Sequence, residues 1–216
     1  MHLLIYGNII IKRVVALKKQ YEKIKEIFKK NGWYARTKDI IEAGIHTSYL
    51  YQMEEKGLIK KIKRGLYRWS NELDFGSELL EVSKIVPNGV LCLVSALDYY
   101  EITTYSSWEY YIAIHRSSRK PVTPDYPPIR FFYFSQKQFE TGIEEIEIEG
   151  EKIKIYDLEK TLCDVVRLRN KVGMDVVKDS LQEYVKRKDR NINKLLHYAE
   201  ITGVPNLMEN YLEVLV

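Results

Sequence analysis

The front of the chain alternates apolar and polar positions with the period of an α-helix. Between residues 18 and 31 the apolar residues lie three or four positions apart among lysines and glutamates; they are Tyr21, Ile24, Ile27 and Phe28. This spacing predicts a helix with one apolar face, which Gly32 ends. A short second helix is predicted from Thr37 to Gly44. A third is predicted from Thr47, as its N-cap, to Gly57. This order of helices is typical of a helix-turn-helix.

Two short β-prone runs follow the third predicted helix. They span residues 58–62 and 66–69, and Lys63-Arg64-Gly65 separates them. Glycine can adopt the positive φ that closes a hairpin. A two-stranded hairpin in this place is the wing of a winged helix. Residues 18–70 are therefore predicted to form a winged helix-turn-helix domain, and residues 1–17 an N-terminal extension.

Behind a polar connection at residues 71–76, strands come first and helices afterwards. A helix is predicted at 77–86 and another within 90–100, with Ser95 as its cap. The predicted strands are 110–115, 130–134, 143–149 and 152–156, and the helices that follow are 158–169, 174–188, 192–201 and 207–215. Strands followed by helices indicate an α+β fold. We predict an α+β protein whose second domain, residues 77–216, ends in a helical group.

The composition is that of a folded protein with its own core. Of the 216 residues, 45% are hydrophobic and 30% are charged, which excludes disorder for most of the chain. Cys92 and Cys163 lie far apart in apolar surroundings, so neither a disulfide scaffold nor a zinc module is expected. We expect both as small buried residues in a reducing cytoplasm.

The charge is divided unevenly along the chain. Residues 1–70 hold 16 Lys+Arg and 6 Asp+Glu, a balance of +10, and residues 71–216 hold 18 and 24, a balance of −6. The two balances add to the net charge of +4. A basic front joined to an acidic remainder predicts an anionic partner for the front, with nucleic acid as the leading candidate.

The first sixteen residues, MHLLIYGNIIIKRVVA, are apolar and β-branched. Lys12 and Arg13 follow the apolar stretch instead of preceding it, unlike in a signal peptide, and the stretch is too short to span a bilayer. No other segment resembles a membrane span, so we expect a cytoplasmic protein without a membrane partner. Three interpretations of the segment stay open: an extra strand, a dimer contact, or a start upstream of the true one.

The third predicted helix and the hairpin carry the candidate DNA contacts. In a major groove, the N-terminal half of the helix would meet base edges, and Gln52 suits adenine through two hydrogen bonds. The candidates in and before the helix are His46, Thr47, Ser48, Tyr51 and Gln52. The hairpin adds basic residues that suit phosphates, namely Lys60, Lys61, Lys63, Arg64 and Arg68. Double-stranded DNA is therefore the predicted partner.

The sequence contains few patterns typical of a catalytic site. The four histidines lack metal-ligand spacing, and no P-loop, GxGxxG or GxSxG motif occurs. Asp157, Glu159 and Asp164 are close in sequence, but Asp157 is more naturally a helix N-cap and Glu159 a partner of the helix dipole. We predict no enzyme, no metal and no cofactor.

Several short segments carry a family resemblance. In the predicted winged helix they are GIHTSYLY at 44–51, GLI at 57–59 and RGLY at 64–67; later segments are VSAL at 94–97 and YDLEKTLCD at 156–164. Together they resemble AbiEi-like antitoxins of the type IV, abortive-infection toxin–antitoxin systems of bacteria and archaea. The resemblance covers nearly the whole chain from about Lys18. One departure is Lys160, where the family usually has arginine.

The resemblance implies a repressor whose winged helix binds inverted repeats in its own promoter, and a C-terminal domain that counters a cognate nucleotidyltransferase toxin in phage defence. No stable complex with the toxin is implied, and either a monomer or a dimer is compatible. The DNA contacts carried over are Ser48, Tyr51, Gln52, Lys63, Arg64 and Arg68. The family offers no catalytic residue. Our candidates for antitoxin function, in and beside the later motif, are Asp157, Lys160, Thr161, Asp164 and Arg167.

Two alternatives stay open beside this interpretation. In the first, the winged helix is a protein-interaction module that docks an acidic protein instead of DNA, because some winged helices serve only in protein contacts. In the second, the C-terminal domain acts on a nucleotide or RNA through Asp157, Glu159 and Asp164. Metal-dependent activity lost on Asp164→Asn would support the second.

Overall fold

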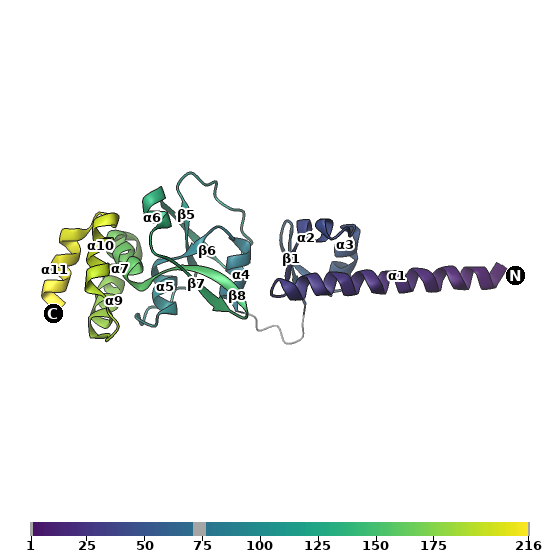
Figure 1. The fold of residues 1–216 in the computed structure, drawn as a ribbon, viewed down its shortest axis with the longest axis horizontal. Coiled ribbons are helices and arrows are strands. Elements are labelled where there is room, and N and C mark those ends of the chain that lie inside the picture. The colour runs from purple at the N-terminus through teal and green to yellow at the C-terminus, as the bar shows by residue number, and fades with distance from the viewer. Residues whose placement is uncertain (1, 71–76, 216) are drawn as a thin grey trace. The chain divides into compact units, whose positions relative to one another are not determined.

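The computed structural model describes residues 2–70 and 77–215, with only the backbone for residues 2–14 and 16. The chain divides into two compact units (Figure 1). The first comprises Met1–Ser77 with Glu149–Glu151, and the second comprises Glu78–Ile148 with Lys152–Val216. Helices and strands occur in both, so the predicted α+β class is confirmed.

The first unit is a winged helix. Its helices are α1 (His2–Lys30), α2 (Thr37–Glu42) and α3 (Ser48–Glu55), and its strands are β1 (Tyr34–Arg36), β2 (Ile59–Lys63) and β3 (Leu66–Trp69). The strands form an antiparallel sheet in the order β1-β3-β2. The predicted hairpin is therefore confirmed. The three-residue β1, which the sequence pattern did not predict, adds a third strand beside β3.

Helix α1 is much longer than predicted. It runs from His2 to Lys30 without a break, so the interpretation of the first sixteen residues as an extra strand is wrong. Isoleucine and valine disfavour a helix only weakly, and no proline interrupts this stretch. The backbone therefore continues the predicted helix toward the N-terminus.

The apolar face predicted for α1 covers the core of the first unit. Ile24 and Phe28 are fully buried, and Tyr21 and Ile27 pack around them. The rest of this core comes from every other element of the winged helix: Ala35, Ile40, Ile45, Leu50, Met53, Ile59 and Tyr67. The two helices after α1 are thereby held against the sheet by their apolar sides.

The second unit is built on a five-stranded mixed sheet. Its strands are β4 (Val90–Leu91), β5 (Tyr110–His115), β6 (Ile129–Phe134), β7 (Ile143–Ile148) and β8 (Glu151–Tyr156), in the order β6-β5-β4-β8-β7. Strand β5 is parallel to β6 and antiparallel to β4, and β4 is parallel to β8. The predicted strands are all present. The two-residue β4, which joins the two halves of the sheet, was not predicted.

Eight helices are described for the second unit: α4 (Glu78–Ile85), α5 (Leu93–Tyr99), α6 (Gln136–Glu140), α7 (Leu158–Arg167), α8 (Arg169–Val172), α9 (Met174–Lys186), α10 (Ile192–Thr202) and α11 (Pro205–Leu215). The later ones gather at one end of this unit (Figure 1). They share with α5 and the sheet one apolar core that includes Leu97, Phe134, Leu162 and Tyr184. Helices α6 and α8 were not predicted.

Two local predictions in this unit had different outcomes. Ser95 does not cap α5, because Cys92 occupies the N-cap position and the Ser95 hydroxyl accepts a hydrogen bond from the Tyr111 amide at 2.9 Å. Cys92 and Cys163 are buried free thiols, as expected. Burial raises the pKa of both thiols, which keeps them protonated.

Candidate nucleic-acid interface

The N-terminus of α3 is capped by a histidine. The predicted cap, Thr47, occupies the N-cap position but makes no capping hydrogen bond. Instead, His46 Nδ1 accepts a hydrogen bond from the Ser48 amide at 3.2 Å and lies 2.8 Å from the Ser48 hydroxyl. A nitrogen that accepts a backbone N–H does here what a serine or threonine oxygen does at other helix N-termini. His46 is therefore tied to the start of α3.

The face of α3 that turns away from the core presents the predicted base-reading residues. Leu50 and Met53 are buried against the sheet. Tyr51, by contrast, is 58% exposed, and Gln52 next to it is half-buried. At the start of the helix, the predicted residue His46 is exposed, whereas Thr47 and Ser48 are half-buried. A phenol, an amide and two hydroxyls thus lie on one short helix and its N-cap residue.

The wing is a tight hairpin with basic residues on both strands. Lys63 of β2 pairs with Leu66 of β3, so Arg64 and Gly65 form the turn. Gly65 has φ +77°, a conformation that glycine adopts without strain. Lys60, Lys61 and Arg64 are exposed, whereas Lys63 is half-buried. Three of the predicted phosphate contacts are therefore open to solvent.

Arg36 joins the wing, although the sequence analysis did not single it out. The pairing of β1 with β3 sets Arg36 beside Leu66, and Leu66 faces Lys63 on its other side. Partial burial and the nearby Arg36 guanidinium lower the pKa of Lys63. An anion bound between or beside two cations that repel one another stabilises the charged form of both. The signal that could have located Arg36 is strand pairing, which the local sequence does not contain.

Arg68 has a different setting from the other basic residues of the wing. It lies on β3, the central strand, where it is opposite Lys60 on one side and Tyr34 on the other. Its side chain is half-buried. Arg68 therefore belongs to the body of the sheet more than to the tip of the wing.

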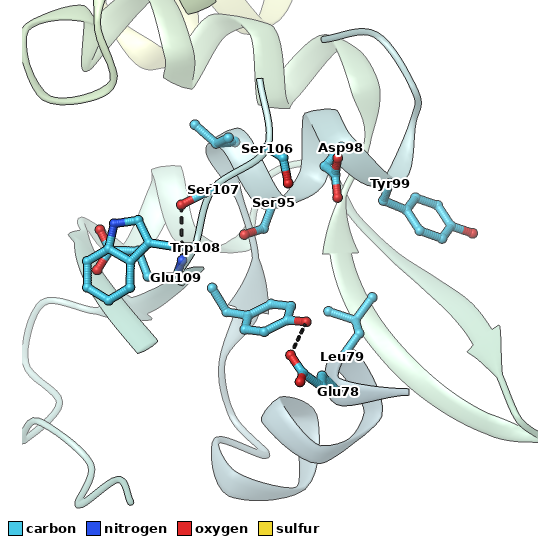
Figure 2. A pocket seen from close by; sticks show the side chains of 11 residues that line it. Glu78, Leu79, Ser95, Asp98, Tyr99, Ser106, Ser107, Trp108 and Glu109 are labelled. Carbon is cyan, nitrogen blue, oxygen red and sulfur yellow. Dashed lines mark hydrogen bonds between the residues drawn. The ribbon is translucent and has the colours of Figure 1, made fainter. Parts of the chain in front are cut away.

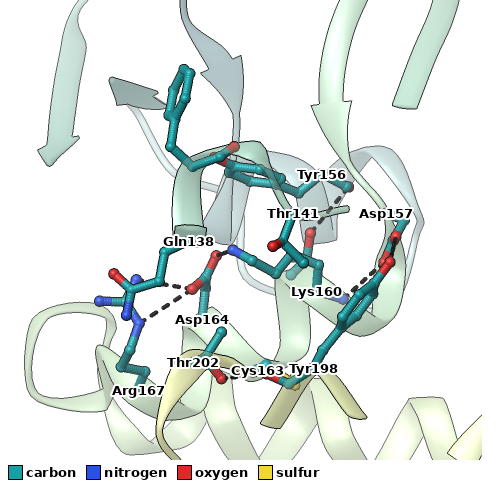
Figure 3. A network of polar contacts seen from close by, with 12 residues as sticks. Gln138, Thr141, Tyr156, Asp157, Lys160, Cys163, Asp164, Arg167, Tyr198 and Thr202 are labelled. Carbon is teal, nitrogen blue, oxygen red and sulfur yellow. Dashed lines mark hydrogen bonds and ion pairs between the residues drawn. The ribbon is translucent and has the colours of Figure 1, made fainter. Parts of the chain in front are cut away.

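The candidates for antitoxin function form a buried polar cluster on α7 (Figure 3). Lys160, Thr161 and Asp164 have no exposed surface. The Lys160 ammonium forms an ion pair with the Asp164 carboxylate, and it lies over the rings of Tyr156, at 4.2 Å, and Phe134, at 5.0 Å. Because a buried ammonium needs both a counter-charge and a polarisable surround, this arrangement compensates for the loss of water.

Arg167 and Gly142 lie at the two ends of the same cluster. Arg167, which is 19% exposed, donates to Asp164 at 2.9 Å. Gly142 packs against the other end, and a Cβ there would lie 2.7 Å from the Cβ of Lys160, so only glycine fits. Thr161 donates its hydroxyl to the Tyr156 carbonyl at 3.2 Å. The cluster therefore locks α7 against β8 and the segment before β7.

Asp157 and Glu159 are also engaged. Asp157 caps α7 by accepting from the Lys160 amide at 2.9 Å, as predicted, and accepts from the Tyr198 hydroxyl at 2.9 Å. Lys194 lies 3.2 Å from Asp157 and 3.1 Å from Glu159. Partial burial of Lys194 disfavours its charge, but the two carboxylates outweigh this and raise its pKa. Asp157, Glu159 and Asp164, to which the second alternative assigns catalysis, thus each have a structural partner.

Among the residues whose side chains the structure describes, no group of three or more histidine, cysteine or acidic side chains is arranged to hold a metal ion. Over the same part of the chain, no helix combines the length and the apolar character that a membrane span requires.

Part of the first unit is similar to a known protein family. Residues 22–68 match the family model described as a transcriptional regulator, AbiEi antitoxin. The matched segment runs from the second half of α1 to β3 and includes all the candidate DNA contacts. No curated protein matches the chain.

A solved structure shares the fold. The crystal structure of the RV2827C protein from Mycobacterium tuberculosis aligns with a TM-score of 0.54 and 11% sequence identity, over 88% of this chain and 79% of that one. At this identity the likeness shows the fold alone. The family match concerns the winged helix alone: residues 22–68 are similar to the AbiEi antitoxin transcriptional regulators.

Proposed function

We propose that the protein is a DNA-binding repressor of its own promoter and the antitoxin of a type IV toxin–antitoxin operon. One observation carries the proposal. A winged helix of the regulator family exposes Tyr51 on α3 and, on the neighbouring hairpin, a basic tip around Arg64. Groups suited to contact base edges and groups suited to bind phosphates thus both lie within the first 70 residues.

The two groups have different tasks in the proposed complex. The exposed Lys60, Lys61 and Arg64 bind phosphates and fix the register on the duplex. Helix α3 then enters the major groove, where Gln52 and its neighbours contact base edges. Repression follows because a protein bound over the promoter excludes the polymerase. Such a protein works in the cytoplasm, on inverted repeats that either a dimer or two monomers can fill.

The buried motif of α7 supports the antitoxin activity indirectly in this proposal. Lys160, Thr161 and Asp164 have no surface to offer a partner. They act by holding α7 in place, so that other parts of the second unit counter the nucleotidyltransferase toxin. A direct complex with the toxin is not required. The second unit is not proposed to be an enzyme, because its clustered carboxylates are each occupied by a cation or a hydroxyl.

DNA binding is tested by fluorescence anisotropy. A labelled duplex from the DNA just upstream of the gene is compared with a scrambled duplex of equal composition, over a salt series. We expect a preference of about a hundredfold or more for the upstream duplex, with an affinity that falls steeply with salt. Equal weak binding to both duplexes would contradict operator-specific repression. No binding at low salt would favour the protein-interaction alternative.

A double variant tests the wing. Lys63→Ala with Arg64→Ala removes two positive charges from the hairpin, and Lys178→Ala with Lys188→Ala removes the same charge from exposed positions of the second unit. We expect the first variant to bind upstream DNA more weakly with a smaller salt slope, and the second to bind as the unaltered protein does. Unchanged affinity in the first variant would remove the wing from the interface.

A further inference from the structure

The second unit contains a hollow of about 420 Å³ that the proposed DNA-binding function does not use. Its walls come from the start of α4, from α5, and from residues 106–110, which lead into β5 (Figure 2). All of these residues belong to the second unit. A hollow of this size accommodates a long side chain with part of its backbone.

Trp108 stands at this hollow with 80% of its surface exposed. Tryptophan is a large aromatic side chain that is highly buried on average and is enriched at protein interfaces. Tyr99, which also lines the hollow, is 41% exposed, and Tyr105 nearby in sequence is 54% exposed. Aromatic side chains that are left open in this way are typical of the central part of a protein interface.

The hollow is acidic. Its lining contains Glu78, Asp98 and Glu109 but neither lysine nor arginine. Two of these carboxylates have partners: Glu78 accepts from the Tyr110 hydroxyl at 3.1 Å, and Glu109 lies 3.1 Å from Arg130. The carboxylate of Asp98 makes no hydrogen bond or ion pair with any residue that the structure describes, and it is exposed. Asp98 therefore has its charge available for a ligand.

We propose that this hollow docks the arginine side chains of a basic segment from a partner protein. A guanidinium can stack on the face of a tryptophan, and it can form two parallel hydrogen bonds to a carboxylate. Trp108 and Asp98, which lie on different sides of the hollow (Figure 2), supply these two groups, and Glu78 adds negative potential. The net charge of −6 over residues 71–216 also favours a basic partner.

A protein segment fits better than a free small cation. Trp108 and Tyr99, which line the hollow, and Tyr105, close to them in sequence, are all exposed, and a single small ion would leave most of this aromatic surface uncovered. A peptide that carries an arginine into the hollow covers the aromatic rim with its backbone and neighbouring side chains. The inference is independent of the proposed DNA binding, because its residues all lie in the other unit.

The test uses the full chain and a labelled peptide that alternates glycine and arginine. A second peptide replaces each arginine with citrulline, which keeps the shape and removes the charge. By anisotropy, we expect the arginine peptide to bind about tenfold more tightly than the citrulline peptide. Asp98→Asn and Trp108→Ala should each abolish most of this difference, whereas Trp108→Phe should retain part of it. Asp125→Asn, which removes an exposed charge outside the hollow, is the matched control.

The other outcomes overturn the proposal. Equal binding of the two peptides, or unchanged binding by both Asp98→Asn and Trp108→Ala, would exclude an arginine site here. Free arginine that competes as well as the peptide, at equal arginine concentration, would identify a small-cation site. Self-association that sedimentation shows to be lost in Trp108→Ala would identify a second copy as the occupant. DNA affinity, measured on the same variants, should not change, so failure of one proposal is distinguishable from failure of the other.

Discussion

Side chains of two kinds lie on the winged helix, and we expect each kind to make a separate contribution to the proposed DNA binding. Gln52 carries an amide that can distinguish one base from another, whereas Arg64 carries a charge that every phosphate attracts equally. The structure sets Gln52 on α3 and Arg64 in the turn of the hairpin. Single substitutions can therefore separate specificity from general affinity.

We expect Gln52→Ala and Arg64→Ala to weaken binding in different ways. Gln52→Ala should relax the preference at a single base position, at a cost of about 1–3 kcal/mol for the preferred base. Arg64→Ala should weaken binding to all duplexes alike and reduce the salt slope by about 1. Anisotropy against a set of duplexes with single base changes measures both. A base preference altered by Arg64→Ala and not by Gln52→Ala would reverse the two assignments.

Because the pKa of Lys63 is lowered, we expect DNA binding to weaken at alkaline pH. In the free protein, burial and Arg36 lower the pKa of Lys63 below its ordinary value of 10.5. A bound phosphate favours the charged ammonium and raises the pKa again. Binding therefore takes up a proton in the window between the lowered and the restored pKa, and affinity falls as the pH rises through that window.

Lys63→Arg is the matched variant for this pH dependence, because arginine keeps its charge throughout. We expect the affinity of the unaltered protein to decline more steeply between neutral and alkaline pH than that of the variant. Anisotropy at constant ionic strength measures both curves. Parallel curves would mean that Lys63 does not contact phosphate.

At the scale of the element, α7 is unusual because it buries charged residues as well as apolar ones. Lysines are seldom fully buried, yet Lys160 has no exposed surface and lies between Asp164 and two aromatic rings. The pair, with Arg167 at its edge, positions α7 in the core. Breaking such a pair costs more than replacing it as a whole, since one broken partner leaves a buried charge without compensation.

Asp164→Asn should therefore lower the free energy of unfolding by about 3–5 kcal/mol. Adding Lys160→Met removes the stranded ammonium and fills a similar volume, so the double variant should recover much of the loss. Urea denaturation followed by circular dichroism measures all three proteins. A loss below about 1 kcal/mol in Asp164→Asn would show that the pair is not needed to hold α7.

At the scale of the molecule, the chain has two separate apolar cores, one in its basic part and one in its acidic part. One core, around Ile24, Phe28 and Met53, lies in the basic front part; the other, around Leu97, Leu162 and Tyr184, lies in the acidic part. A unit with its own core can unfold on its own. The predicted division at residues 71–76 leads to the same expectation.

Calorimetry should accordingly resolve two unfolding transitions. Met53→Ala removes a fully buried side chain from one core, and Leu162→Ala does so in the other. Each should destabilise its own transition by about 2–5 kcal/mol and leave the second in place. One cooperative transition that both variants shift together would reject two independent domains.

Long elements with a clear period were predicted closely from the sequence. The strand at 110–115 was found as β5 (Tyr110–His115), and the helix at 174–188 as α9 (Met174–Lys186). Four elements of two to five residues, namely β1, β4, α6 and α8, were missed, although the similarly short hairpin strands β2 and β3 were predicted on either side of their glycine turn. So few positions cannot establish a period, and β1 and β4 exist because a neighbouring strand supplies their hydrogen bonds.

For the candidate sites, the sequence by itself determined which residues lie on α3 and on the hairpin, because helical period, glycine turns and clustered lysines are local signals. Only the tertiary structure decided their surroundings. Strand pairing brought Arg36 to Lys63, and helix packing buried Lys160. Chain folding also gathered Asp98 and Trp108 at one hollow. These three results depend on how helices, strands and loops pack against one another, and such packing leaves no local pattern in the residues on either side.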